Sequence, residues 1–141
     1  MTTEPNHERK SVRIILDSNA LFVPLQFKID IFVELRNLLK RNFELILLSP
    51  IRRELERLAQ EGQPMMKKNA SYALKLAEKC RAVRLREEFG SSADDIIIRV
   101  SHEWSCPVFT NDKQLRKRLR DINVPVIYVR QKSRLEIDGR I

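Results

Sequence analysis

Two kinds of apolar pattern alternate along this chain. Short, nearly continuous apolar runs predict five β-strands, at residues 12–17, 43–48, 82–85, 107–110 and 124–129. Longer stretches with apolar residues at helical spacing predict helices at residues 31–41, 50–61, 64–79, 94–104 and 113–122. Strands that alternate with helices favour right-handed crossovers and parallel pairing. We therefore expect an α/β fold with three layers, α/β/α, around a central, largely parallel five-stranded sheet.

Local signals refine these elements. An apolar connection at residues 21–27 follows the first strand. Ser49 and Pro50 are typical of a helix start, with Ser49 as N-cap and Pro50 at the first helical position. Residues 90–93 are expected to form a turn, in which Ser91 or Ser92 caps the following helix.

Length and composition suit one domain. The chain has 141 residues, of which 43% are hydrophobic, enough to build a single core. The first ten residues are polar and mixed in charge, and the last eleven are rich in Lys and Arg. We expect a flexible leader at residues 1–10, a domain at 11–130 and a basic C-terminal tail at 131–141.

The first strand ends in an acidic residue, Asp17. No polar residue interrupts the run from Ile14 to Leu16, which is typical of a strand buried on both faces. In open α/β sheets, ligands bind just outside the carboxyl ends of the strands. A carboxylate there needs a partner if it is buried, so Asp17 is expected to face a site.

Three further acidic positions are expected at the same edge of the sheet. Glu54 lies in the second turn of a helix that follows a strand, Asp94 or Asp95 opens another helix, and Asp112 follows the strand at 107–110. Carboxylates that gather repel one another unless a cation neutralises them. Oxygen ligands select Mg²⁺ or Mn²⁺, which can activate water for phosphodiester hydrolysis. Taken alone, Asp94, Asp95 and Asp112 could serve only as favourable charges at helix N-termini, and Glu54 could pair with a neighbouring arginine. Asp17 has no such simple structural explanation.

Charge favours a polyanionic partner. Lys and Arg number 27 against 19 acids, the net charge is +8 and the isoelectric point is near 9.9. Nucleic acid is the first candidate and an anionic membrane surface the second. The alternative is a solvated surface rich in Lys, Arg and Glu, as in thermophilic proteins.

Other classes of protein are disfavoured. Two cysteines and two histidines match neither a disulfide framework nor a zinc site. There is no glycine-rich phosphate-binding motif, no secretory signal and no apolar run that could span a bilayer. We expect a cytoplasmic protein that does not bind membranes.

A basic helix follows Asp112 and is a candidate RNA-binding surface. Its cationic residues are Lys113, Arg116, Lys117, Arg118 and Arg120. Further cations could extend this surface into a track that contacts RNA phosphates: Lys67, Lys68, Lys75, Lys79, Arg130, Lys132, Arg134 and Arg140. Aromatic residues are few, and Trp104 is expected in the core or at an interface, which favours recognition of RNA shape over base reading.

Four ordered motifs, LDSNALF, RELERLA, SADDIII and FTNDKQLRKRL, make the sequence resemble the PIN-domain ribonucleases. The resemblance runs from about residue 12 to residue 129. Within the family, the chain is most similar to compact archaeal relatives of the eukaryotic PIN nuclease of small-subunit rRNA processing. VapC-type toxins share the same fold and acids.

The resemblance implies a Mg²⁺- or Mn²⁺-dependent endoribonuclease, with rRNA as the favoured substrate. It implies that the catalytic, metal-binding carboxylates are Asp17, Glu54, Asp94 and Asp112. Asp95 would then be a helper or a cap. The residues implied to orient ligands or a metal-bound water are Ser18, Asn19, Thr110 and Asn111.

Several alternatives stay open at this point. A VapC-type toxin would cleave tRNA or other RNA and bind an antitoxin, whereas an rRNA-processing nuclease would meet ribosome-assembly proteins. A non-catalytic RNA-binding or assembly module could keep the fold, and a flavodoxin-like phospho-acceptor domain is a weaker rival. Homodimerisation is plausible because small PIN domains often pair.

Overall fold

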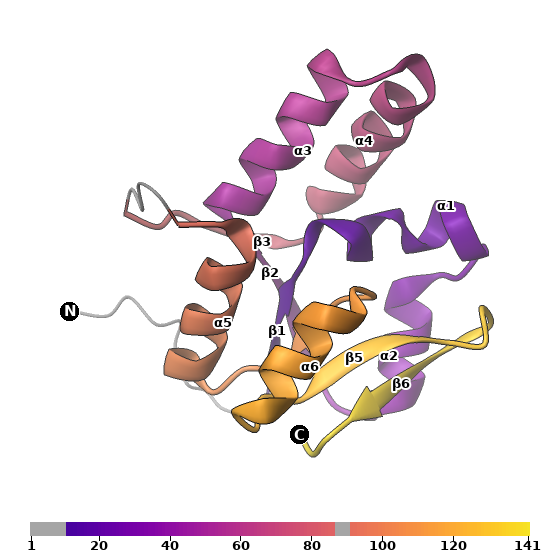
Figure 1. The fold of residues 1–141 in the computed structure, drawn as a ribbon. Coiled ribbons are helices and arrows are strands. Elements are labelled where there is room, and N and C mark those ends of the chain that lie inside the picture. Colours follow the sequence, from indigo (N-terminus) through magenta and orange to yellow (C-terminus); the bar gives the residue numbers. More distant parts are fainter. Residues whose placement is uncertain (1–10, 87–90) are drawn as a thin grey trace.

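The computed structural model describes residues 11–86 and 91–141, and within them six strands form one sheet (Figure 1). Their order across the sheet is β3-β2-β1-β4-β5-β6, and all neighbours pair in parallel except β5 and β6. The strands are β1 (Val12–Leu16), β2 (Phe43–Leu48), β3 (Arg81–Val83), β4 (Val108–Phe109), β5 (Val126–Arg130) and β6 (Arg134–Asp138). The expected leader at residues 1–10 and residue 90 of the expected turn lie outside the described residues.

Helices occupy the connections between the parallel strands, as the apolar spacing predicts. They are α1 (Val23–Phe27), α2 (Ile31–Leu39), α3 (Ser49–Glu61), α4 (Pro64–Ala77), α5 (Ala93–Trp104) and α6 (Lys113–Asp121). A 3-10 helix, η1 (Ser18–Phe22), precedes α1, so the apolar connection expected at 21–27 is helical. Its residues Ala20 to Val23 are buried in the core.

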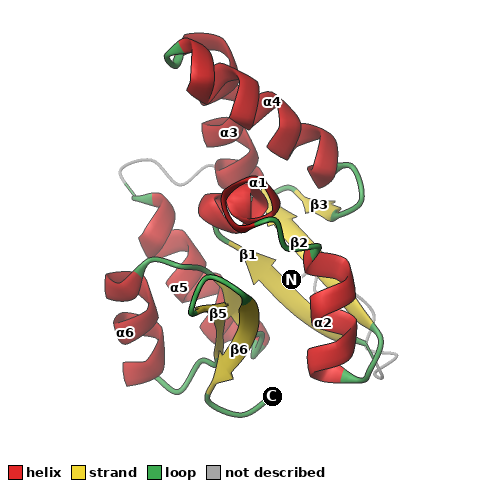
Figure 2. Cartoon of the chain, turned by 90° about the vertical axis from the view of Figure 1, so that its right-hand side faces the viewer, coloured by secondary structure: helices red, strands yellow, loops and turns green. Residues whose placement is uncertain are grey.

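The sheet lies between helices on its two faces (Figure 2). The helices α5 and α6 cover one face, α2 lies on the other, and α3 and α4 pack against each other above the carboxyl edge of β1 and β2. The expected α/β/α layers and largely parallel sheet are therefore confirmed. Within the ranges that the structure describes, no helix is both long and apolar enough to cross a bilayer.

β1 is the centre of the sheet. Ile15 pairs with Ile46 of β2 on one side and with Val108 of β4 on the other, and Ile14 to Leu16 are fully buried. A continuous apolar run is what a strand covered by helices on both faces requires. The chain leaves this core at Asp17, whose backbone N–H still donates to the carbonyl of Phe109 at 3.1 Å.

The sheet has a sixth strand that the sequence pattern does not predict. β6 pairs antiparallel with β5 in a hairpin, from Val126 opposite Asp138 to Arg130 opposite Arg134. Leu135 is only 3% exposed and adds to the core. The expectation of five strands followed by a basic tail at 131–141 is thus wrong, because most of that segment completes the sheet.

The expected N-cap is confirmed at α5 and is wrong at α3. The Ser92 hydroxyl accepts from the Asp95 N–H at 3.1 Å at the start of α5. At α3, the N-cap is Leu48, and Ser49 is already helical. The Ser49 hydroxyl instead accepts from the Leu85 N–H at 2.9 Å and fastens the segment after β3 to the end of β2.

Candidate active site

Asp17 is a buried carboxylate at the carboxyl end of β1, where only 6% of the residue is exposed. One carboxylate oxygen, Oδ1, accepts from the Ser18 N–H at 2.8 Å. The other, Oδ2, accepts from the Thr110 hydroxyl at 2.7 Å and from the Asn19 amide at 3.1 Å. Both oxygens are therefore held in fixed positions by groups from η1 and from the end of β4.

A chain of polar contacts extends this network across three strand ends. The Asn19 side-chain oxygen accepts from the Asn111 N–H at 3.1 Å, and the Asn111 side-chain oxygen accepts from the Val129 N–H at 2.9 Å. The Thr110 hydroxyl also accepts from the Asp112 N–H at 3.1 Å. The ends of β1, β4 and β5 are thus tied together around Asp17.

The surroundings of Asp17 oppose its ionisation on balance. Burial raises the pKa of the carboxyl above its usual range, and the negative charges of Glu54 and Asp112 raise it further. The hydrogen bonds from Thr110 and Ser18 lower the pKa and compensate only in part. An added positive charge at this position would relieve the cost.

The two neighbouring aspartates that open α5 have opposite surroundings. The pKa of Asp94 is raised by burial and by the charges of Asp17 and Asp112, against a weaker lowering by Arg118. The pKa of Asp95 is lowered, chiefly because Arg118 donates to its carboxylate at 2.9 Å. Asp94 therefore faces the acidic side and Asp95 a basic side chain of α6.

Glu54 and Asp112 border the same region from two helices. Asp112 is the N-cap of α6, where its Oδ1 accepts from the Gln114 and Leu115 N–H groups. Glu54 lies on α3 and lines a shallow hollow of about 380 Å³ that also reaches the start of α5 at Ala93. The topology predicts this convergence, since β1 lies between β2, which leads into α3, and β4, which leads into α6.

The donor set suits a hard divalent cation, although the side chains do not form a closed ligand shell. Among the residues that the structure describes, no three His, Cys, Asp or Glu side chains stand close enough together to hold a metal ion as they are. Their charges nevertheless act on one another, because Glu54 and Asp112 raise the pKa of Asp17. Glu54 is partly exposed and Asp112 is exposed, so both side chains are free to turn toward a cation. Carboxylate oxygens are the ligands that Mg²⁺ and Mn²⁺ prefer.

All three arginines of the candidate RNA-binding helix α6 form ion pairs within the protein. Arg116 and Arg120 both pair with Asp138 of β6, at 2.9 and 3.1 Å, and Arg118 pairs with Asp95. Lys113 and Lys117 have no ion-pair partner among the described side chains. Asp138 was missed from the sequence together with β6, although the alternating pattern RLEID carries the signal for an exposed strand.

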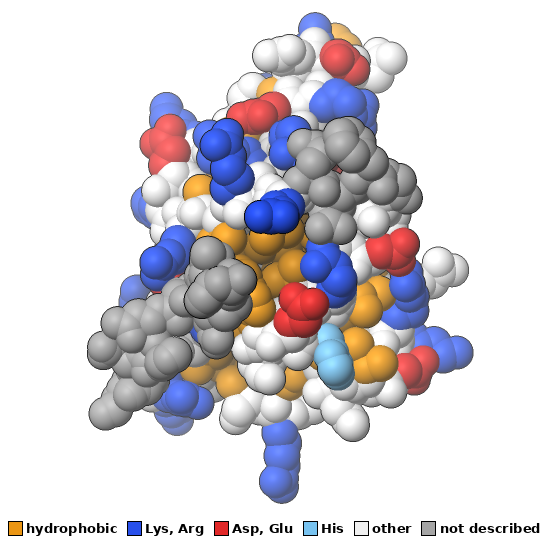
Figure 3. Space-filling view, turned by 90° about the vertical axis from the view of Figure 1, so that its left-hand side faces the viewer, with side chains coloured by type: hydrophobic (Ala, Val, Ile, Leu, Met, Phe, Trp, Pro, Cys, Tyr) orange, Lys and Arg blue, Asp and Glu red, His pale blue; other side chains and the backbone are white. Residues whose placement is uncertain are grey.

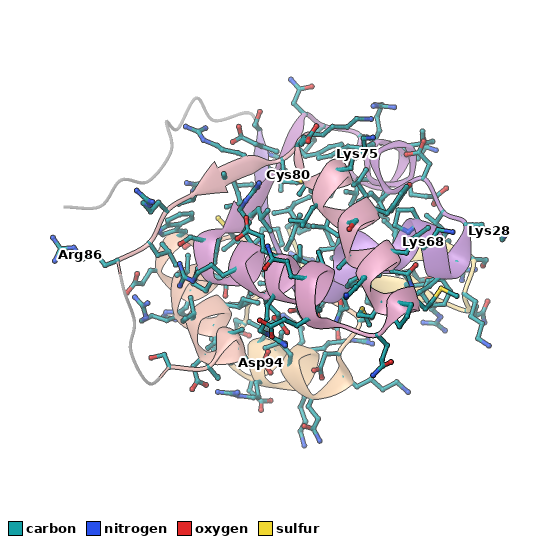
Figure 4. The ribbon with its side chains drawn as sticks, turned by 90° about the horizontal axis from the view of Figure 1, so that it is seen from above. Lys28, Lys68, Lys75, Cys80, Arg86 and Asp94 are labelled. Atoms are coloured by element: carbon teal, nitrogen blue, oxygen red, sulfur yellow. The ribbon has the colours of Figure 1, made fainter. Side chains whose placement is uncertain are left out.

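The other expected cations are spread over the surface. On the face shown in Figure 3, Lys and Arg side chains are interleaved with Asp and Glu and do not form one continuous patch. Seen from above, Lys68 and Lys75 lie on α4, away from Asp94 at the start of α5 (Figure 4). Arg130 and Arg134 share Glu136 as an ion-pair partner. The phosphate track along α4 and the C-terminal segment therefore stays a prediction.

Known proteins similar to this chain carry names of nucleases. Ribonuclease VapC4 of Methanocaldococcus jannaschii is 35% identical over 130 residues, which cover 92% of this chain and 98% of that protein. Ribonuclease VapC9 of Archaeoglobus fulgidus is 28% identical over 124 residues, or 88% of this chain and 87% of that protein.

Solved structures agree on the fold. The PIN domain endonuclease Utp24 matches with a TM-score of 0.75 and 30% identity over 92% of each chain. VapBC2 of Rickettsia felis matches with a TM-score of 0.63 over 84% of this chain and all of that one, and at 13% identity it supports the fold alone. The family model described as a PIN like domain matches residues 14–132. The chain belongs to the PIN-domain ribonuclease family.

Proposed function

We propose that this protein is a Mg²⁺- or Mn²⁺-dependent endoribonuclease whose four carboxylates, Asp17, Glu54, Asp94 and Asp112, hold the metal. The observation that carries the proposal is electrostatic. Burial raises the pKa of Asp17 and of Asp94, and the negative charges of other members of the same group raise both further, while the nearby hydrogen bonds and Arg118 compensate only in part. Acids kept at such a cost point to a cationic ligand.

Each residue has a distinct part in this proposal. Ser18, Asn19 and Thr110 fix the orientation of the Asp17 carboxylate, while Asn111 holds the loop between β4 and α6 against β5. Bound Mg²⁺ or Mn²⁺ would supply positive charge to the scissile phosphate and lower the pKa of a coordinated water. Lys113 and Lys117, at the start and middle of α6, would hold flanking phosphates.

A cleavage assay tests the proposal. A structured rRNA fragment is incubated with the wild-type protein, Asp17→Asn or Asp112→Asn, in Mn²⁺, Mg²⁺ or EDTA. We expect cleavage by the wild type with metal only, and a loss of about a hundredfold or more in each variant. Asp112→Asn is the sharper variant, because asparagine is as good an N-cap as aspartate and α6 should remain folded.

The chain provides a matched control for Asp112→Asn. Asp30 caps α2 in the same way, since its Oδ1 accepts from the N–H groups of Phe32 and Val33. Asp30→Asn should therefore cleave like the wild type. If Asp112→Asn and Asp30→Asn cleave RNA at the same rate, or if wild-type cleavage persists in EDTA, the proposal of a metal-dependent carboxylate site is wrong. RNA binding without any cleavage would favour the non-catalytic RNA-binding module.

For the biological role we propose rRNA maturation, on the resemblance of the four motifs to the rRNA-processing branch of the family. The specific alternative is a VapC-type toxin, favoured by the names of the similar ribonucleases. An antitoxin gene immediately upstream, and cleavage of tRNA in preference to precursor rRNA, would support the toxin. Accumulation of unprocessed rRNA in cells that carry Asp112→Asn would support the maturation role.

A further inference from the structure

A hollow of about 570 Å³ lies between the start of α6 and the β5–β6 hairpin, beside the carboxylate site. Residues that line it include Thr110, Asn111, Lys113, Arg116, Tyr128 and Lys132. The sequence pattern predicts phosphate contacts for Lys113, Arg116 and Lys132, but it does not predict the hairpin or the place of Tyr128 beside them. The hairpin contributes half of the residues that line the hollow, so a ligand bound there should contact the hairpin.

The hollow is continuous with the network around Asp17. Thr110 lines the hollow and its hydroxyl donates to the Asp17 carboxylate at 2.7 Å. Asn111, the next residue, accepts from the N–H of Val129, which also lines the hollow. A group seated here would lie next to whatever reacts at the carboxylates.

Inside the hollow, an aromatic ring and a guanidinium group are already stacked. The Arg116 guanidinium lies over the Tyr128 ring, 3.7 Å from its centroid. Asp138 holds the guanidinium in place through Arg116 Nε at 2.9 Å. Aromatic rings and guanidinium planes are the surfaces on which unpaired bases stack, and a platform fixed in advance loses little entropy on binding.

The charge of the hollow suits phosphate. Four cations line it, Lys113, Arg116, Arg130 and Lys132, and no Asp or Glu is found among its described lining residues. Arg130 is paired with Glu136 at 3.3 Å, whereas Lys113 and Lys132 have no ion-pair partner in the described part of the chain. These two lysines come from different elements, Lys113 from α6 and Lys132 from the hairpin turn.

We propose that this hollow binds an unpaired nucleotide of the RNA next to the scissile phosphate. The base stacks on the Tyr128–Arg116 pair, and Lys113 and Lys132 contact the adjoining phosphates. The inference rests on the proposed ribonuclease function and adds a subsite for one nucleotide beside the scissile phosphate. Stacking tolerates any base, so the hollow selects unpaired nucleotides with little sequence preference.

Binding in EDTA tests the hollow separately from catalysis. The probe is a short, mixed-sequence, fluorescent RNA oligonucleotide, single-stranded or annealed to its complement. We expect the wild type to prefer the single strand. Tyr128→Leu should weaken single-strand binding about tenfold, whereas Tyr128→Phe, which keeps the ring, should bind like the wild type.

The phosphate contact has its own measurement and control. Lys132→Gln should reduce the slope of log affinity against log salt by about 0.7, the value for one contact on a single strand. Lys40→Gln is matched, because Lys40 also has a left-handed backbone, with φ of 53° against 59° for Lys132, and lies at the end of α2. Lys40→Gln should leave the slope unchanged.

The outcomes separate the hollow from the nuclease. If Tyr128→Leu and Lys132→Gln bind RNA like the wild type while Asp112→Asn fails to cut, the proposed nucleotide site is wrong and the proposed nuclease activity is supported. If the wild type never cuts RNA but Tyr128→Leu and Lys132→Gln show the expected loss of binding, the nucleotide site is supported and the proposed nuclease activity is wrong. If Tyr128→Leu changes only self-association, measured by light scattering, the hollow holds a second copy of the chain and the proposal is overturned.

Discussion

Asp94 and Asp138 carry the same side chain in opposite surroundings. Asp138, in the last strand, accepts from Arg116 at 2.9 Å and from Arg120 at 3.1 Å, so two guanidinium groups offset its charge. Asp94, at the start of α5, is partly buried and faces the negative charges of Asp17 and Asp112, and both causes raise its pKa. The chain thus has arginines available, and it directs two of them to the acid in the hairpin.

The difference separates structural acids from acids that await a ligand. An acidic side chain that pairs with a cation of the same chain adds a little to the stability of the folded protein. An acid without one costs stability until an external cation arrives. Four experiments test whether these two kinds of acid differ as proposed.

The largest effect is expected for cleavage by Asp94→Asn. Removing this carboxylate should reduce RNA cleavage in Mn²⁺ by about a hundredfold or more, as for loss of one electrostatic group in an active site. Asp95→Asn is the matched neighbour and should keep most of the activity, since Asp95 faces Arg118. The measurement is the initial rate on the structured rRNA fragment. The reverse ranking of the two variants would show that Asp95 is the third acid of the site.

The next effect is stabilisation by metal. A cation at about a hundred times its dissociation constant should raise the free energy of unfolding of the wild type by about 2.7 kcal/mol. Asp94→Asn should gain clearly less, because one ligand is lost. Thermal unfolding in Mg²⁺, Mn²⁺ and EDTA measures both. An equal gain in the two proteins would place the ion elsewhere.

A smaller effect is expected in the hairpin. Asp138→Asn removes the charge that pairs with Arg116 and Arg120, and because these pairs are about one-third exposed the free energy of unfolding should fall by only about 1 kcal/mol. Urea denaturation provides the measurement. The control is Glu56→Gln, which breaks a single exposed pair with Arg52 on α3 and should cost less. A more stable Asp138→Asn protein would show that Asp138 is also an uncompensated acid.

The smallest effect is a dependence on pH in EDTA. Because the pKa values of Asp17 and Asp94 are raised by folding, the folded state binds their protons more tightly than the unfolded state. The metal-free protein should therefore gain stability from these two groups as pH falls from 7 toward the ordinary aspartate pKa of about 3.9. Asp94→Asn should show a weaker gain over this range. The comparison uses thermal midpoints of the two proteins at matched pH.

The core elements could be predicted from the sequence because burial leaves a plain pattern. The run from Ile14 to Leu16 identifies β1, and the helical spacing of apolar residues identifies the crossovers. The sequence does not single out β6, because its alternating run RLEID is only five residues long and directly follows a basic segment that is also typical of a solvated tail. Ser49 was misassigned as an N-cap because its partner, Leu85, lies 36 residues further along the chain.

The candidate site was predictable in position but not in detail. Strand order brings the acids to one edge, and that order follows from the alternation of strands and helices. Asp94 and Asp95 are about 100° apart on a helix, and both fit the first turn. Arg118, on a different helix, distinguishes them, and a single sequence does not reveal that contact. The same is true of the pairing of Arg116 with Asp138.

The position of β6 also matters for aggregation. An outermost strand presents unpaired backbone groups to which the strand of another chain can add. β6 bears charged side chains at Arg134, Glu136 and Asp138, which discourage such pairing. A chain shortened to residue 130 would leave the apolar strand VIYVR of β5 at the edge. The charged strand that positions Arg116 thereby also protects the folded protein from growing into fibrils at high concentration.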